Sequence, residues 1–404
     1  MNRFFKILAS APATFANAPH AARVGMLMFF AAAVADGILM PFFALWAHKD
    51  AGIPIEFIGL LLACYAGGEL LATPFVGGIA DRVGRRPVLL ISTLGVGFGF
   101  LLLYFVHGAV GVALALMTIG VFESVLHPTA ATVIADVVPE ETRREHFALT
   151  RVMSNAGSMI GPAVGAVLAL KSLALVFLGS AITLLVGSLG IAVFLYETRK
   201  SYGEHNEEEE ESLFALAAAF CDSRLAGLLA PIALLEIAES WIQSITPLYA
   251  DAGGTLTASG IGWLFTYAGA LGVFLQMPVT EATERMTGFS IVLWSGAIQA
   301  VAFACLLLSP ALPSLVAAVT LLALSQMLSG PLVQAIITAL APRSAQAAYQ
   351  AAFSVIYDLK DAAGPAIGTW LYAISAGLPW GSGIVVSIAA SLGLAAAARK
   401  HEKG

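Results

Sequence analysis

The feature that most constrains the fold is a series of twelve apolar segments, each about as long as a lipid bilayer is thick. A hydrocarbon core of about 30 Å is crossed by roughly 20 helical residues. The segments lack the apolar–polar alternation of an outer-membrane barrel strand, so we expect helices. They lie at 21–47, 55–79, 87–106, 109–138, 145–170, 172–196, 225–250, 257–281, 288–308, 312–340, 345–375 and 380–398. The sequence therefore predicts an all-α polytopic membrane protein with twelve transmembrane helices.

The composition argues against most other classes of protein. Of the 404 residues, 59% are hydrophobic and 11% are charged, whereas a soluble protein has about 25% charged residues. The net charge of −6 argues against a nucleic-acid partner. Three scattered cysteines are too few for a disulfide framework or a metal cluster. Because the phosphate-loop pattern G-x-x-x-x-G-K-[ST] and the zinc pattern H-E-x-x-H are both missing, we expect no enzyme activity, no cofactor and no metal site.

Polar breaks divide the chain into five segments. The longest break contains five consecutive glutamates at 207–211, and a block of like charge repels itself and stays solvated. Residues near the start imitate a signal peptide, but Pro12 interrupts the apolar patch, so we expect an uncleaved tail. The expected segments are an N-terminal tail (1–20), a six-helix bundle (21–196), a cytoplasmic linker (197–224), a second six-helix bundle (225–398) and a C-terminal tail (399–404).

The basic residues predict the orientation in the membrane. If both termini are cytoplasmic, all but three of the 20 lysines and arginines fall on cytoplasmic segments. Lys49 and Lys171 then lie on the opposite side, and Lys360 lies within a span. Because cytoplasmic loops are rich in Lys and Arg, we expect a multi-pass protein of the plasma membrane, which is the inner membrane in a bacterium. We expect a monomer in the lipid bilayer with both termini cytoplasmic.

The two halves of the chain repeat each other at an offset of 203 residues without a gap. Each half holds an even number of spans, so both halves enter the membrane in the same orientation. Parallel repeats of this kind are typical of transporters whose substrate site lies between two rocking halves. The matched positions are Asp36 with Glu239, Gly59 with Gly262, Asp81-Arg82 with Glu284-Arg285, Pro128 with Pro331, Pro139 with Pro342, and Gly161-Pro162 and Gly165 with Gly364-Pro365 and Gly368.

A loop between the second and third spans carries the most specific motif. Residues 77–89 read G-G-I-A-D-R-V-G-R-R-P-V-L, which resembles the major facilitator superfamily signature G-x-L-a-D-R-x-G-R-R-x-x-L. The resemblance implies the fold of that superfamily, two pseudo-symmetric six-helix bundles. Asp81 can accept hydrogen bonds from helix N-terminal amides or pair with an arginine. The resemblance also implies a conformational latch that ties the two halves together in the outward-facing state, formed by Gly77, Asp81, Arg82, Gly84, Arg85, Arg86 and Asp136.

A second motif lies in span five. The pattern Gly157-x-x-x-Gly161-Pro162-x-x-Gly165 resembles the glycine-proline motif of the superfamily's 12-span drug:proton antiporters. Small residues at this spacing let helices approach closely, and proline removes an amide donor. The resemblance implies a role in sealing the cavity, and the repeat in span eleven, Gly364-Pro365 with Gly368, fits a symmetric role.

One position departs from those exporters. They usually carry an intramembrane arginine in span four, which the superfamily links to proton transfer. The corresponding residue here is Leu116. Any mechanism that depends on that arginine is therefore missing its central group in this chain.

Acidic residues inside the spans are the strongest sign of a functional site. A charge at the bilayer centre costs about 2.5–3.5 kcal/mol, so seven unpaired charges would cost on the order of 20 kcal/mol. The acids must therefore be protonated, paired or facing water, and a carboxyl in such a setting can load and release protons. The seven acids are Asp36, Glu69, Glu123, Glu236, Glu239, Asp358 and Asp361, and His127 and Lys360 accompany them.

Depth and span number predict one common site for these residues. Asp36, Glu123, Glu239 and Asp358 lie about 13–15 residues from the cytoplasmic end of their helix, which is roughly 20 Å at 1.5 Å per residue. In the superfamily, spans one, four, seven and ten line a central cavity, with spans two, five, eight and eleven beside them. All seven acids fall on those eight spans, which is what a water-accessible cavity predicts.

Spacing suggests how the polar side chains pair. Glu123 and His127 share a helical face because they are four residues apart, and we expect either a proton-titrating pair or a structural hydrogen-bonded pair. We expect Lys360 to form an ion pair with span seven, which carries Glu236 and Glu239. The alternative is that Lys360 forms a purely structural salt bridge within the C-terminal half. Four intramembrane glutamines are expected to form inter-helix hydrogen bonds: Gln243, Gln276, Gln299 and Gln326.

Together these features predict a proton-coupled secondary active transporter. We expect it to export small organic compounds, amphipathic or cationic, by alternating access, with protons and a small-molecule substrate as partners. A proton symporter that imports a small nutrient remains an alternative within the same fold. A non-transporting membrane receptor or scaffold remains an alternative of another class.

Overall fold

The computed structural model describes residues 12–198, 222–283, 285–341 and 346–402. Most of the predicted linker and the outer parts of both predicted tails therefore lie outside the described residues. Within these ranges the chain is almost entirely helical, and the predicted all-α class is confirmed.

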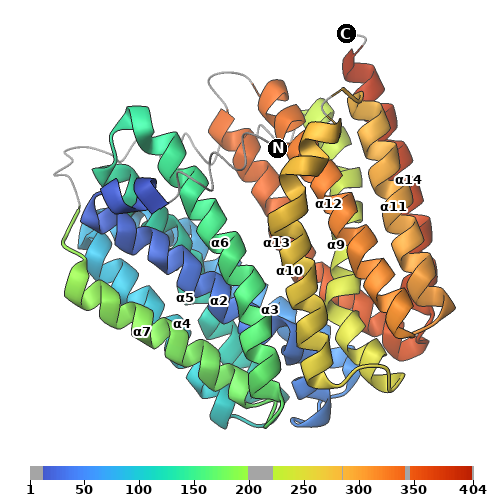
Figure 1. Cartoon of the computed structure of the whole chain (residues 1–404), viewed down its shortest axis with the longest axis horizontal. Helices are drawn as coiled ribbons and strands as arrows, with labels where there is room; N and C mark the ends of the chain where they lie inside the picture. Colours follow the sequence, from blue (N-terminus) through green and yellow to red (C-terminus); the bar gives the residue numbers. More distant parts are fainter. Residues whose placement is uncertain (1–11, 199–221, 284, 342–345, 403–404) are drawn as a thin grey trace. The chain divides into compact units, whose positions relative to one another are not determined.

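The helices drawn in Figure 1 follow the predicted spans closely. Predicted and observed ends differ mainly where a helix continues past its apolar run, as in α6, which begins at Glu140 rather than 145. The first six are α2 (His20–Lys49), α3 (Ile55–Val83), α4 (Arg85–Phe105), α5 (Ala109–Val137), α6 (Glu140–Ala169) and α7 (Leu175–Phe194). The next six are α9 (Ser223–Ala252), α10 (Ala258–Thr283), α11 (Gly288–Leu308), α12 (Leu312–Leu340), α13 (Gln346–Ile374) and α14 (Leu378–Glu402).

Eleven of these helices are long and apolar enough, over the described residues, to cross a membrane. The remaining one is α13, which carries Asp358, Lys360 and Asp361 along one stretch. Large apolar side chains such as Val110 and Leu308 lie exposed on the outer faces of their helices. Such surfaces are stable when lipid rather than water surrounds them.

The described chain forms two compact units. The first comprises Met1–Lys200 with Leu256–Phe274, and the second comprises Ser201–Thr255 with Leu275–Gly404. The first part of α10 thus packs with the N-terminal helices. In the first unit, α2 packs on α6 and α7, α4 packs on α5 and α7, and α3 packs on α5.

The second unit repeats four of these five helix pairs. Its α9 packs on α13 and α14, and its α11 packs on α12 and α14. These pairs correspond, at the predicted offset, to the pairs of α2 with α6 and α7 and of α4 with α5 and α7. The internal repeat read from the sequence is therefore a repeat of helix packing.

Proline and glycine mark the helix boundaries. Pro19, Pro54 and Pro139 directly precede α2, α3 and α6, where the missing amide of proline costs no helical hydrogen bond. Gly84 separates α3 from α4 with a φ of 111°, and Gly108 precedes α5 with a φ of 94°. Only glycine adopts such angles without strain.

Residues before α2 belong to the folded part of the first unit. Ala18 is buried in an apolar cluster with residues of α2, α5 and α6, among them Met26 and Ile134, and Phe15 packs against it. The side chain of Arg23 donates a hydrogen bond to the carbonyl oxygen of Ala18 at 3.0 Å. The last residues of the predicted N-terminal tail therefore pack against the helices.

Candidate functional site

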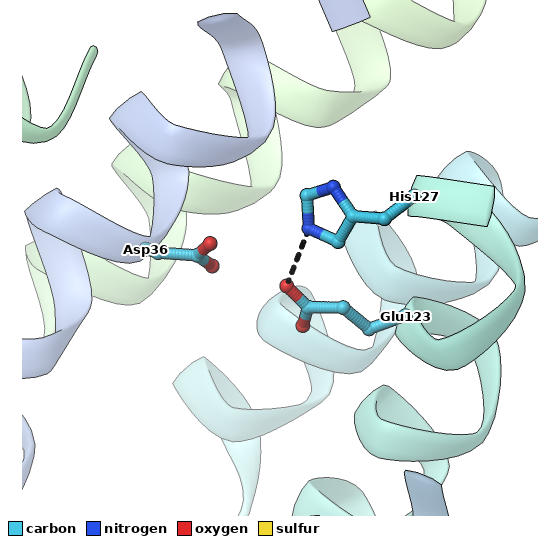
Figure 2. A group of neighbouring side chains, drawn as sticks. All are labelled: Asp36, Glu123 and His127. Carbon is cyan, nitrogen blue, oxygen red and sulfur yellow. Dashed lines mark ion pairs between the residues drawn. The ribbon is translucent and has the colours of Figure 1, made fainter. Parts of the chain in front are cut away.

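In the first unit, three of the predicted site residues converge. Figure 2 shows Asp36 reaching from α2 toward Glu123 and His127, which come from α5. One carboxylate oxygen of each acid and one ring nitrogen of His127 all lie within 4.8 Å of one another. The Nε2 atom of His127 is 3.7 Å from Oε1 of Glu123. The predicted i, i+4 pair is therefore present, and Asp36 joins it.

Burial makes it unfavourable for the carboxylates of this cluster to be charged at the same time. The side chain of Glu123 is 6% exposed, whereas that of His127 is 39% exposed and stacks near Phe29. Two carboxylates this close repel each other when both are charged, so a proton or another small cation between them stabilises the group. Among the described residues, the imidazole of His127 is the one basic side chain recorded against this pair.

A neighbouring pair on α3 extends the cluster. The hydroxyl of Tyr65 donates to Oε1 of Glu69 at 3.2 Å, and Tyr65 also lies beside the carboxyl of Glu123. Asp36 in turn lies within electrostatic reach of Glu69. The structure thus brings together four predicted residues, Asp36, Glu69, Glu123 and His127, and adds a tyrosine that the predicted set did not include.

Close approach of α3 and α5 positions these side chains. A Cβ on Gly68 would collide with the backbone of Met117, and a Cβ on Gly120 would collide with the carbonyl of Tyr65 and the amide of Glu69. The two backbones therefore touch one turn from Glu123. Small residues allow this approach, which brings Tyr65 and Glu69 next to the acid on α5.

The glycine motif of α6 supports the cluster from the side of α2. A Cβ on Gly157 would lie 2.7 Å from the carbonyl oxygen of Phe30, and one on Gly165 would lie 2.7 Å from that of Ile38. Between them, Gly161 and Pro162 contact Gly37, the residue after Asp36. Gly262 of α10 packs against the carbonyl of Pro162 in the same unit. The motif therefore presses on the segment that carries Asp36.

The second unit has its own polar cluster. The Nζ atom of Lys360 on α13 is 3.7 Å from Oε2 of Glu236 on α9 and 4.0 Å from Oδ1 of Asp361. The predicted ion pair between Lys360 and span seven is therefore present. The side chain of Asp358, the other predicted acid of α13, lies outside the described side chains.

Glu239 has amide partners instead of a cation. Its Oε1 accepts a hydrogen bond from the side-chain amide of Gln326 on α12, and Nε2 of Gln243 lies 3.5 Å from the same atom. Gln299 donates to the carbonyl of Leu235 on α9, and Gln276 donates to that of Met327 on α12. Three of the four glutamines thus bridge helices as predicted, whereas Gln243 bonds within α9.

The second glycine motif also packs on an acid-bearing helix. A Cβ on Gly364 would collide with the side chain of Ser240, the residue after Glu239. A Cβ on Gly368 would lie 2.7 Å from the indole of Trp241. Pro365 lies between them inside α13. Each motif therefore packs directly beside the repeat-related acid of its own unit, Asp36 or Glu239.

The predicted latch residues form a network at one end of the first unit. Nε of Arg85 donates to Oδ2 of Asp136 at 3.4 Å, and Nη2 of Arg86 donates to the carbonyl oxygen of Ala192 at 2.7 Å. Arg82 is exposed, and the surroundings of Gly77 and of the Asp81 side chain lie outside the part of the structure that is described. One loop arginine, Arg85, therefore pairs with Asp136, whereas the latch function stays a prediction.

Glu197, after α7, is the residue of this network that the sequence did not reveal. Its two carboxylate oxygens accept hydrogen bonds from the backbone amides of Arg85 and Arg86, at 2.8 and 3.2 Å. These are the first amides of α4, which have no partner within the helix. A carboxylate at a helix N-terminus is stabilised by the helix dipole. No local pattern could connect Glu197 to a helix that begins 112 residues earlier.

Comparison with known families decides the class of the protein. The family model described as Major Facilitator Superfamily matches residues 25–254, more than half of the chain. The chain belongs to the Major Facilitator Superfamily. It is therefore a transporter and not an enzyme, embedded in a membrane by many helices.

Curated members of the superfamily are similar to this transporter at low identity. The "Tetracycline resistance protein, class E" of Escherichia coli is 28% identical over 218 residues, which are 53% of this chain and 54% of that protein. The chain thus aligns with only about half the length of that relative. The class C protein of Escherichia coli is 25% identical over 335 residues, 80% of this chain and 82% of that protein.

A solved structure of the superfamily shares the fold over nearly the whole chain. It is a bacterial homologue of the human lysosomal transporter Spinster, in an inward-facing and unoccupied conformation. The TM-score is 0.77 at 13% identity, with 95% of this chain and 98% of that chain covered. At this identity the likeness establishes the Major Facilitator Superfamily fold alone.

Proposed function

We propose that this transporter exports small organic compounds, amphipathic or cationic, in exchange for protons. It works by alternating access, as a monomer of the plasma membrane with both termini cytoplasmic. The observation that carries the proposal is the cluster of Asp36, Glu123 and His127, whose ligand atoms lie within 4.8 Å of one another. Carboxylates held this close bind a proton or release it when a cation takes its place.

The relatives support export over import. Two of them are named for tetracycline resistance, and a membrane transporter confers resistance most directly by removing the compound from the cell. The glycine motif that packs on α2 beside Asp36 also matches the pattern of 12-span exporters. Import of a nutrient by proton symport is the competing function on the same fold.

The direction of transport can be tested in membrane vesicles with an imposed pH gradient. Everted vesicles that are acidic inside should accumulate tetracycline or organic amines from a probe panel, and a protonophore should abolish the accumulation. Right-side-out vesicles that are acidic outside should accumulate the probe if the protein is an importer. Accumulation only in the second arrangement would overturn the proposed export.

The same vesicles test whether the acidic cluster couples transport to protons. Asp36→Asn and Glu123→Gln should remove gradient-driven accumulation while the protein remains inserted in the membrane. If neither substitution altered gradient-driven accumulation, the proposed role of Asp36 and Glu123 in proton coupling would be wrong.

A further inference from the structure

Glu239 is buried and organised as a hydrogen-bond acceptor. It is 7% exposed in the interior of α9. Its Oε1 atom receives the amide of Gln326 from α12 and lies 3.5 Å from the amide nitrogen of Gln243, one turn along α9. Two amides therefore fix one carboxylate oxygen, and both belong to the same unit as Glu239.

The arrangement leaves three acceptor atoms for another partner. Each glutamine must turn its NH2 group to the carboxylate, since an amide oxygen would be repelled, and this leaves the two amide oxygens available. Among the described residues, no hydrogen bond is recorded for Oε2 of Glu239 or for these amide oxygens. Oε2 of Glu239 is also not one of the fully buried atoms without a partner, so it is accessible to solvent.

In the described part of the second unit, Lys360 acts on Glu239 only from beyond ion-pair distance. Lys360 is engaged with Glu236 at 3.7 Å and with Asp361 at 4.0 Å. Over the described part of the chain, Glu239 has no ion pair within 4.0 Å. A buried carboxylate without a cation is costly unless it is neutralised or paired. The site is therefore complementary to a positively charged group that brings several N–H donors.

We propose that Glu239, Gln243 and Gln326 form a recognition site for organic cations that carry N–H donors, namely primary or secondary ammonium and amidinium groups. This inference rests on the proposed transport of small organic compounds and names the chemical class of the substrate. An ammonium group with two or three N–H bonds can donate to Oε2 of Glu239 and to an amide oxygen together. A quaternary ammonium keeps the charge but has no N–H, so it leaves buried acceptors unpaired.

The test measures binding without any gradient. The full chain is purified in detergent, and the affinities of tryptamine and of its N,N,N-trimethyl analogue are measured by isothermal titration calorimetry at one pH. A charged hydrogen bond is worth about 1.5–3 kcal/mol, so tryptamine should bind roughly tenfold or more tightly than its analogue. Thermal unfolding of each protein sample confirms that it is folded.

Matched variants show which side chains produce the preference for tryptamine over its trimethyl analogue. Gln326→Leu removes one amide, and Glu239→Gln removes the charge while keeping the shape of the side chain. Glu239→Gln should reduce the ratio of the two affinities to near one, and Gln326→Leu should reduce it in part. Gln299→Leu is the control because Gln299 is an amide of equal size that donates to Leu235 on the same helix, and it should retain the ratio. Because the two test variants change different side chains of the same site, failure of one to fold leaves the other to decide.

Three results would overturn the site: equal affinities for both probes in the wild type, no binding of tryptamine, or an unchanged preference in a folded Gln326→Leu or Glu239→Gln protein. These results are separate from those that test proton coupling. If the wild type shows no preference for tryptamine but keeps gradient-driven transport, only the recognition site is refuted. If the wild type prefers tryptamine but its transport does not respond to an imposed pH gradient, only the proposed proton-driven export is refuted.

Discussion

Gly161 of α6 lies directly on Gly37 of α2, so that a Cβ built on Gly161 would be 2.7 Å from the Cα of Gly37. The same Cβ would be 2.6 Å from the carbonyl oxygen of Val34. Asp36 stands between these two contacts on α2. The position of that carboxyl therefore depends on a helix contact that has no room for a single methyl group.

Gly161→Ala should lower both stability and transport. Overpacking of this kind costs about 1–3 kcal/mol, against a gain of up to about 1 kcal/mol in helix propensity. We expect a lower melting temperature in detergent and slower gradient-driven transport. Gly190→Ala in α7 is the control, since no atom lies within 4 Å of the added Cβ, and it should match or exceed the wild type. Equal behaviour of the two variants would contradict the packing account.

Lys360→Met should destabilise the second unit. Breaking a fully buried ion pair costs about 3–5 kcal/mol, and the side chains of Lys360 and Glu236 are 15% and 17% exposed. We therefore expect a loss of about 2–4 kcal/mol in the free energy of unfolding. The double variant Glu236→Gln/Lys360→Met should recover most of this loss, because the buried carboxylate of Glu236 is no longer left without its cation, and Asp361 is 55% exposed. A double variant as unstable as Lys360→Met would show that the pair is not the cause.

Glu197→Ala should loosen the start of α4. Two backbone amides lose their acceptor, and removal of a helix cap costs about 0.5–2 kcal/mol. Hydrogen exchange should accelerate in the first turn of α4, at Arg85 and Arg86, and remain unchanged at the start of α11. Glu197→Gln keeps one oxygen acceptor and should show a smaller effect. Exchange as slow as in the wild type would contradict the capping role.

The fold was predictable because the bilayer imposes a length and an apolar composition on every span. Errors in the predicted ends follow from the same reasoning: α6 begins at Glu140 and α3 continues to Val83. Helical hydrogen bonds do not stop where the apolar run stops, so polar first and last turns escaped a prediction based on hydropathy.

The site was partly predictable for two different reasons. The pair of Glu123 and His127 follows from helical spacing, and the convergence of Asp36 on it follows from the equal depth of Asp36 and Glu123 in two of the spans expected to line the cavity. The role of Tyr65 beside Glu69 was missed because a tyrosine in an apolar span is more often a packing residue. The amide of Gln326 at Glu239 depends on which faces of α9 and α12 meet, and single-sequence periodicity does not specify that.

The most direct test of the central claim uses Glu123→Gln in proteoliposomes, with the probe compound that everted vesicles accumulate. Two rates are compared: exchange of labelled for unlabelled probe without a gradient, and accumulation driven by an imposed pH gradient. The account predicts that the variant keeps exchange but loses gradient-driven accumulation, because the cluster of Asp36, Glu123 and His127 carries the proton. Gradient-driven accumulation at the wild-type rate would contradict it.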